Sequence, residues 1–227
     1  DAIWQGACAA YLENQSALKG VVSSAGFGDD AYRAWLDATA AENRRLVRDE
    51  YTPDPEKASV AAQVLYGVSN GLAKYGMAAA VGAAAGPASI AVTPVVFGAS
   101  VGINETQKLK DEGVDDETAT KAGMVSGAMN AFWGGVPGAF GRSIMTGASL
   151  GAFTSYNEMG AIKTVLENAD YSKLALKYDP TDPVGMGVNA LVGGLMGPVS
   201  AGASWKARGS RSAQAAQATG ADAPGLT

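Results

Sequence analysis

Charged and uncharged stretches alternate along most of the chain, and this alternation is the strongest pattern in the sequence. Three stretches of 30, 20 and 23 residues carry no charge, namely 75–104, 122–141 and 183–205. Stretches of roughly 20 uncharged residues have the length that crosses a bilayer as a helix. The pattern therefore predicts membrane-competent helical spans within the region 53–205, separated by polar corners.

The uncharged stretches are rich in alanine and glycine rather than in leucine and isoleucine, and the mean hydropathy of the chain is only +0.03. Gly86, Pro87 and Pro94 interrupt the first stretch, which predicts two helices joined by a turn. No segment shows the period-two alternation of a strand. We therefore predict an all-α fold of Gly/Ala-rich helical hairpins that is part of an oligomeric assembly.

Polar clusters mark the places where helices are expected to begin and end. Asp54 is expected to cap a helix that has Pro55 at its first position. Gly113 stands where a helix C′ residue is expected, and Asp115 where the next N-cap is expected. The cluster 179–183, Asp-Pro-Thr-Asp-Pro, is expected to end one helix and begin another.

The same pattern divides the chain into three parts. Residues 1–52 are predicted to form an N-terminal helical segment, and residues 53–205 the Gly/Ala-rich hairpin region. Residues 206–227 contain almost no large apolar side chain, which predicts a flexible tail or linker. Within the polar corner 158–183, one apolar stripe over 162–166 predicts an amphipathic surface helix.

Glycines and alanines four positions apart give several predicted helices a smooth face. The ladder Gly123, Gly127, Ala131, Gly135, Ala139 is the best instance. Such a face lets two helices approach until dispersion and weak Cα–H contacts hold them, in a membrane or in a soluble bundle alike. The predicted helix-packing residues are Gly82, Gly86, Gly98, Gly102, Gly123, Gly127, Gly135, Gly193 and Gly197. Replacing Gly127 with leucine is then expected to block assembly while leaving helicity intact.

Aromatic residues lie near the ends of the uncharged stretches. Tyr75, Trp133 and Trp205 are therefore candidate interfacial anchors. The more ordinary interpretation, which we favour, makes them packing anchors in a glycine-rich core.

The composition offers little for catalysis. The chain has no histidine and a single cysteine, Cys8, so the commonest general base and metal ligand is missing and no internal disulfide can form. The patterns Gly-x-Ser-x-Gly at 98–102 and 147–151 lack a base and a preceding strand. The acids at 115–117 suit helix capping, and Glu158 stands isolated. We predict no catalytic residue, no metal site, no cofactor and no enzyme activity.

Four segments, in this order, resemble a known family. They are the proline-flanked segment 51–57, the Gly/Ala hairpin 81–87, the segment 98–105 (GASVGINE) and the corner 113–123 (GVDDETATKAG). Over residues 52–205 the chain resembles the glycine-rich helical region of the large internal virion proteins of short-tailed bacteriophages, the DNA-ejection or pilot proteins. The shared features are compositional rather than chemical, so no catalytic residue is carried over.

This resemblance implies a function. Proteins of that family are packed in the capsid around the portal and build a conduit through the host envelope during infection. The expected partners are further copies of this chain and other ejection or portal proteins, with the host membrane as a further candidate. The net charge of −5 leaves only non-specific contact with phage DNA. Two alternatives stay open: a membrane-permeabilising helical domain that acts alone, and a structural spacer within a large virion polyprotein.

Overall fold

The computed structural model describes residues 1–140 and 144–196, which are helical almost throughout and contain no strand. The elements are α1 (Ala2–Ser24), α2 (Asp30–Leu46), a π-helical turn η1 (Val47–Tyr51), α3 (Val60–Ala84), a 3-10 turn η2 (Gly86–Ala88), α4 (Ser89–Asp111), α5 (Asp116–Phe140), α6 (Ile144–Asn168) and α7 (Ser172–Ala175). Residues 183–196 form a further helix, named the final helix below. The all-α prediction is confirmed. The predicted tail 206–227, Gly197 and Trp205 lie outside the described residues.

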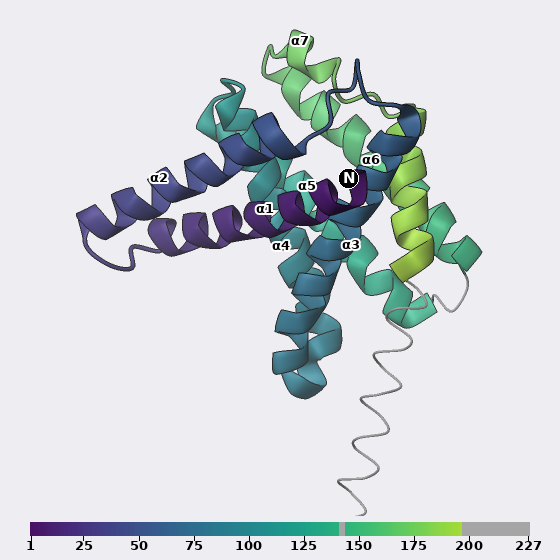
Figure 1. Cartoon of the computed structure of the whole chain (residues 1–227), viewed down its shortest axis with the longest axis horizontal. Helices are drawn as coiled ribbons and strands as arrows, with labels where there is room; N and C mark the ends of the chain where they lie inside the picture. The colour runs from purple at the N-terminus through teal and green to yellow at the C-terminus, as the bar shows by residue number, and fades with distance from the viewer. Residues whose placement is uncertain (141–143, 197–227) are drawn as a thin grey trace, which may run out of the picture.

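Hairpins of neighbouring helices build the molecule (Figure 1). The α1–α2 hairpin projects to one side, and the η2 turn between α3 and α4 lies at the tip of a second projection. Helix α1 packs on α3, and α4 packs along α5. The final helix lies against α3 and α6. The predicted interruption at Gly86 and Pro87 is therefore a helical hairpin turn.

The corner between α4 and α5 follows the chemistry that the sequence predicts. Gly113 has a φ of 88°, the left-handed region that favours glycine. Asp115 Oδ1 accepts hydrogen bonds from the backbone N–H groups of Glu117 and Thr118, each at 3.0 Å. These backbone bonds, that from Thr118 foremost, hold the pKa of Asp115 below its usual value. The C′ glycine and the N-cap are confirmed.

The predicted helix start at Asp54 is wrong. Asp54 Oδ1 accepts a bond from the backbone N–H of Glu56 at 2.9 Å, which closes a turn rather than a helix. Helix α3 begins at Val60, where the Ser59 hydroxyl accepts a bond from the backbone N–H of Ala62 at 3.2 Å. Both positions offer a capping side chain, and the apolar surface that the helix buries begins only after the second.

An aromatic core lies where α3, α4, α5 and the final helix meet. The Tyr75 and Phe97 rings make an edge contact with centroids 5.7 Å apart, and Trp133 lies 6.3 Å from Phe97. Tyr75 is 7% exposed and Trp133 3%. These two residues therefore pack in the interior, and the interpretation as interfacial anchors is corrected at both positions.

A second core lies at the α4–α5 corner, where α6 and α7 cover it. Leu109, Ile162 and Leu166 are fully buried there, with Val114 and Tyr178 beside them. The predicted surface helix over 162–166 is thus the end of α6, and its apolar stripe lies in the interior.

Within residues 1–140 and 144–196, no helix combines the length and the apolar character needed to cross a membrane. The expectation of membrane-competent spans is therefore not met in the part of the chain that the structure describes. Alanine and glycine make a helix smooth and uncharged, but they add far less hydrophobic transfer energy than leucine or isoleucine.

Candidate functional site

Helices α4 and α5 approach each other closely, and glycines form the contact. A Cβ atom on Gly98 would lie 2.3 Å from the carbonyl oxygen of Gly127, and one on Gly102 would lie 2.5 Å from that of Gly123. A real Cβ atom does not come this close to a backbone oxygen, so only glycine permits the two helices to approach in this way. Four of the predicted packing residues thus meet in one contact.

The final helix is held in the same way. A Cβ on Gly193 would lie 2.3 Å from the carbonyl oxygen of Gly147 in α6. On its other side the Val188 and Val192 side chains fill the space left by glycines 67 and 71 of α3. The close approach is again inside the chain.

The remaining predicted packing glycines differ among themselves. Gly82 faces Thr93, whose Oγ1 would lie 2.0 Å from an added Cβ. Gly135 has only ordinary contact with Pro94, at 3.5 Å. Gly86 has open space around its Cβ position and a φ of 59°, so it serves the turn and not a helix contact. The packing role predicted for Gly86 is therefore corrected.

These contacts within the chain decide which glycine faces are available to a second copy of the chain. The faces through Gly98, Gly102, Gly123 and Gly127 are covered by helices of the same chain. They are therefore not open to a neighbouring subunit, and an assembly of several copies would have to use another surface.

Between the two cores lies a polar layer, formed by Glu105, Lys108, Ser126, Asn130, Glu158 and Tyr178. The Glu158 carboxylate accepts hydrogen bonds from the Ser126 hydroxyl and, at 3.0 Å, from Asn130 Nδ2. Both partners are neutral, and Ser126 is fully buried. Burial without a directly bonded cation raises the pKa of Glu158 to about 7. This carboxyl group thus changes its charge near neutral pH.

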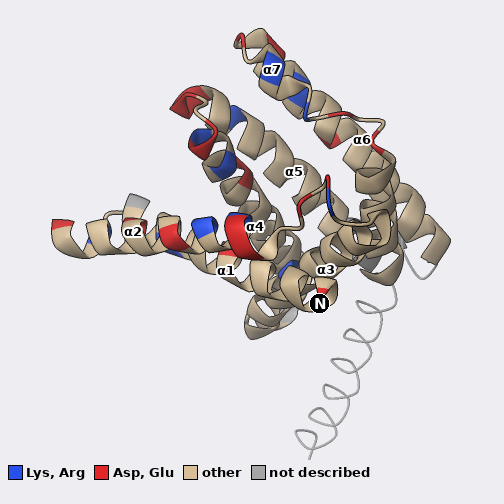
Figure 2. Ribbon diagram, turned by 45° about the horizontal axis from the view of Figure 1, so that its top comes forward, with Lys and Arg blue, Asp and Glu red and all other residues tan. Residues whose placement is uncertain are grey.

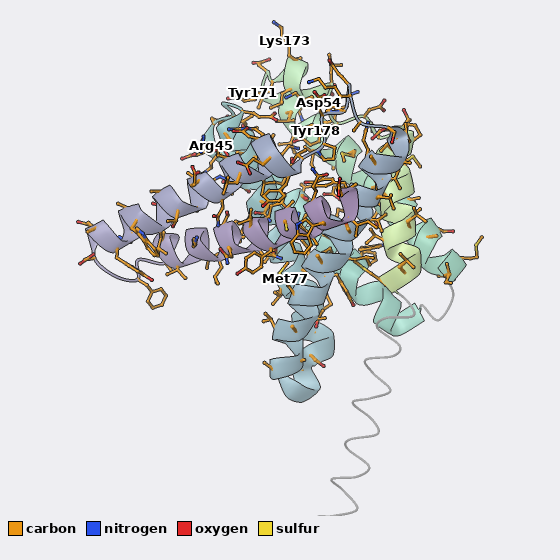
Figure 3. All side chains as sticks on the ribbon, in the orientation of Figure 1. Arg45, Asp54, Met77, Tyr171, Lys173 and Tyr178 are labelled. Carbon is orange, nitrogen blue, oxygen red and sulfur yellow. The ribbon has the colours of Figure 1, made fainter. Side chains whose placement is uncertain are left out.

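Tyr178 forms the other half of the polar layer. Its hydroxyl donates to Glu105, and Lys108 Nζ lies 3.2 Å from the same hydroxyl. Lys108 Nζ also lies 3.5 Å from Glu105 and 4.9 Å from the centre of the Tyr178 ring. Tyr178 and Tyr171 lie on the side of the molecule that carries α7 (Figure 3). Burial and the nearby Glu105 charge raise the pKa of Tyr178 above its usual range.

Sequence reasoning misses the polar layer, because Glu158 has no acidic or basic neighbour that marks it as part of a site. A signal is nevertheless present. Glu158 precedes Ile162 by four positions, so it shares the apolar face of α6. Ser126 and Asn130 are likewise four apart within the uncharged stretch of α5. A polar residue inside an apolar stripe is an indication of a buried polar contact.

Replacing Tyr178 with phenylalanine tests this layer. The change removes a hydroxyl that binds both Glu105 and Lys108, and we expect it to destabilise the fold by about 1–2 kcal/mol. Urea unfolding followed by circular dichroism measures the loss. Tyr156→Phe is the matched control because Tyr156 is half exposed in α6. An equal effect of both substitutions would contradict a structural role of the Tyr178 hydroxyl.

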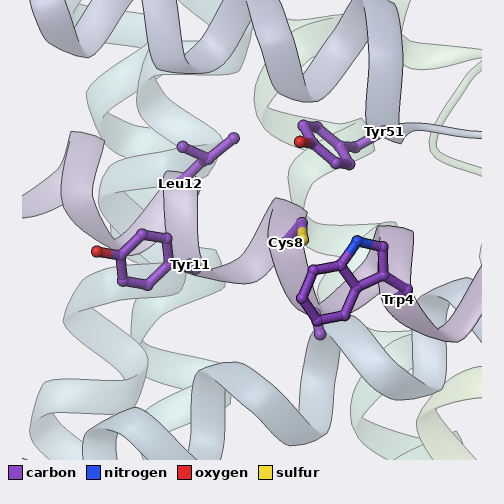
Figure 4. A pocket seen from close by; sticks show the side chains of 6 residues that line it. Trp4, Cys8, Tyr11, Leu12 and Tyr51 are labelled. Carbon is purple, nitrogen blue, oxygen red and sulfur yellow. The ribbon is translucent and has the colours of Figure 1, made fainter.

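The outer face of α1 carries large apolar side chains at intervals of seven, namely Trp4, Tyr11 and Leu18, which are 71%, 56% and 65% exposed. A groove of about 340 Å³ runs beside the first two. It is lined by Trp4, Ala7, Cys8, Tyr11, Leu12 and Tyr51. Trp4, Cys8 and Tyr51 lie together at one end of it (Figure 4). An exposed apolar surface of this kind is a candidate interaction site.

The part of the chain that the structure describes holds no group of three or more acidic or cysteine side chains placed to bind a metal ion. The serines of the two Gly-x-Ser-x-Gly patterns lie inside α4 and α6. No family model matches the chain, and no curated protein or solved structure is significantly similar to it.

Proposed function

We propose that this chain is a non-enzymatic helical segment of a bacteriophage ejection protein. It associates with copies of itself and forms or supports a conduit for phage DNA across the host envelope. The proposal takes the virion role from the sequence resemblance and the self-association from one structural observation. That observation is the exposure of large apolar side chains on outer helix faces.

The exposed apolar side chains are numerous and large. Besides the α1 face, Phe132 of α5 and Phe153 of α6 are each about two-thirds exposed, and Met124 and Met145 are exposed as well. Burying such groups against another protein is favourable by about 1.5–3 kcal/mol for each side chain that becomes fully covered. The glycines meanwhile hold the helices of one chain together, so the two kinds of surface have separate tasks.

The interior also suits a protein that unfolds and folds again. The largest fully buried side chains among the described residues include Leu109, Ile162, Leu166 and Met196, and many of the other buried positions are alanines. Because burial of large apolar side chains supplies most of a domain's stability, we expect unfolding to cost less here than in a leucine-rich domain. Hairpins of consecutive helices have mostly local contacts, which favours rapid folding. A segment that leaves the capsid through a narrow portal needs both properties.

Charge supports a conduit that does not bind DNA tightly. The net charge is −5, and charged residues gather on α2, at the α4–α5 corner and near α7 (Figure 2). Helix α3 carries few of them. DNA then passes without a dominant basic surface to hold it, and the partners are protein: further copies, other ejection proteins and the portal. The proposed locations are the virion interior and then the host envelope.

The proposal is tested by the assembly state of the purified full chain. Light scattering coupled to size exclusion is expected to give an oligomer, and electron microscopy to show rings or tubes. Release of dye from loaded vesicles is measured on the same samples. A stable monomer without effect on vesicles would overturn the proposal in favour of a spacer. A monomer that releases dye would overturn it in favour of a permeabilising domain.

A further inference from the structure

We infer that the α1 face, defined by Trp4, Cys8, Tyr11 and Leu18, pairs antiparallel with the α1 face of a second copy of this chain. In this pairing Leu18 of each copy fills the groove of the other. The inference rests on the proposed self-association and names the surface that carries it.

Helix geometry places a projection and a groove at opposite ends of one face. Trp4, Tyr11 and Leu18 are seven residues apart, which puts them on one stripe of α1. The groove spans the level of residues 4–12, and Leu18 projects from the stripe beyond it. With a rise of about 1.5 Å per residue, Leu18 lies about 15 Å from Cys8 along the helix. A two-fold axis between these levels, near Glu13, brings each Leu18 to the other copy's groove.

Charge selects a second copy as the occupant. Lys19 follows Leu18, and Glu50 precedes Tyr51 at the rim of the groove. Neither Lys19 nor Glu50 has an ion-pair partner among the residues that the structure describes. The same two-fold axis brings Lys19 of one copy toward Glu50 of the other, twice in each dimer. A parallel pairing would instead set Lys19 beside Lys19 and leave both grooves empty.

Interfaces of this kind are self-complementary, so the same substitution acts twice. Lys19→Glu places an acid toward Glu50 in both halves, and we expect the dimer to dissociate about tenfold more readily. The double variant Lys19→Glu with Glu50→Lys restores opposite charges. It is expected to return the dissociation constant to that of the unchanged chain.

Disulfide cross-linking of the full chain is the decisive test, because Cys8 is the single cysteine. In Leu18→Cys, the antiparallel pairing sets the introduced thiol of one copy against Cys8 of the other. Diamide, which takes up the two electrons and two protons of the two thiols, is expected to yield a covalent dimer. The two cysteines of one chain are too far apart to bond with each other, since a disulfide needs Cα atoms within about 7 Å.

Two controls separate this contact from random collision. Leu176→Cys also adds an exposed cysteine in place of an exposed leucine, and it is expected to stay monomeric on denaturing gels. Leu18→Cys combined with Cys8→Ala is expected to lose the cross-link. If Leu18→Cys links no better than Leu176→Cys while light scattering still gives oligomers, the α1 pairing is overturned and the proposed function stands. If the full chain is monomeric in every measurement, the α1 pairing and the proposed function are both overturned.

A lipid surface is the rival occupant of the α1 face. Flotation with vesicles of phosphatidylcholine and phosphatidylglycerol distinguishes it, because lipid binding needs the apolar stripe but no groove or charge pairing. Flotation that Leu18→Asp abolishes, together with an absent cross-link in Leu18→Cys, would assign the face to a membrane and overturn the dimer.

Discussion

Replacing Gly127 with leucine is expected to destabilise the folded chain by about 3 kcal/mol or more, and so to lower its helical content under mild denaturant. A Cβ at this position would lie 2.9 Å from the Gly98 carbonyl oxygen and 3.3 Å from the Gly102 Cα atom. Both neighbours are backbone, which cannot rotate aside as a side chain can. The α4–α5 contact therefore has to open before leucine fits.

The same substitution at Gly76 is the matched control. Gly76 lies within helix α3, is exposed, and has nothing within 4 Å of its Cβ position. Leucine there gains helix propensity of nearly 1 kcal/mol without a clash, so we expect a slightly more stable protein. Urea unfolding by circular dichroism compares the two variants. Equal midpoints for Gly127→Leu and the unchanged chain would contradict the glycine contact between α4 and α5.

This expectation differs from the one that the sequence supports. Spacing by four predicts that Gly127 lies on a smooth face, but it does not say which helix covers that face. The structure covers it with α4 of the same chain, through Gly98 and Gly102. The predicted effect of leucine at Gly127 accordingly moves from assembly with intact helices to the fold itself.

Local chemistry explains which parts of the fold could be predicted. Gly113 supplies a positive φ, and Asp115 caps the backbone N–H of a residue three positions later. Both effects are local, so the α4–α5 corner could be predicted from the sequence. Ser59 and Asp54 are both suitable caps, and the choice between them depends on tertiary burial. Glu158 depends on α5, whose Ser126 and Asn130 lie some thirty residues away along the chain. A contact between residues so far apart along the chain cannot be recognised in any short segment of the sequence.

The exposure of the α1 face could not be predicted from the sequence for a related reason. A stripe of Trp4, Tyr11 and Leu18 is what an ordinary core-facing helix carries, so its spacing alone does not distinguish an outer face from a buried one. In the structure the opposite face of α1, which includes Gly6 and the buried Ala9, packs against the rest of the chain. Small residues make the intrachain contact and large ones face outward, which inverts the usual arrangement of a helix.

Replacing Glu158 with glutamine is expected to remove most of the pH dependence of stability near neutrality. In the unchanged chain, the free energy of unfolding should fall by about 2 kcal/mol between about pH 5.5 and about pH 8.5. In Glu158→Gln it should stay nearly constant over that range. Glutamine keeps the shape of the side chain, and its amide can accept from Asn130 while donating to Ser126.

The sign of this pH dependence follows from which state of the chain, folded or unfolded, binds the proton of Glu158 more tightly. Folding raises the pKa of Glu158 from 4.5 to about 7, chiefly because burial disfavours its charged form. The folded chain therefore holds this proton at pH values where the unfolded chain has lost it. The resulting stability is full below pH 4.5 and is lost as the pH rises through about 7.

The carboxyl groups with lowered pKa values and the tyrosines with raised pKa values act outside this pH range. The pKa values of Asp54, Asp115 and Asp179 are lowered, so the stability that they add is lost only in more acidic solution. Tyr66 and Tyr178 have raised pKa values and respond only in more alkaline solution, that of Tyr66 rising to about 12.

Chemical denaturation at each pH measures the effect, with Glu167→Gln as the matched control. Glu167 lies in the same helix and is exposed, with only a 4.0 Å ion pair to Lys163. Its substitution should leave the pH dependence unchanged. The charges of Glu105 and Lys108 act on the Glu158 carboxylate, and their effects on its pKa oppose one another. Lys108→Met is therefore expected to shift the Glu158 transition to higher pH, since it removes the charge that favours the ionised form. If the pH dependence survives in Glu158→Gln, another group titrates in this range. The contacts of Glu158 with Ser126 and Asn130 would then not be its cause.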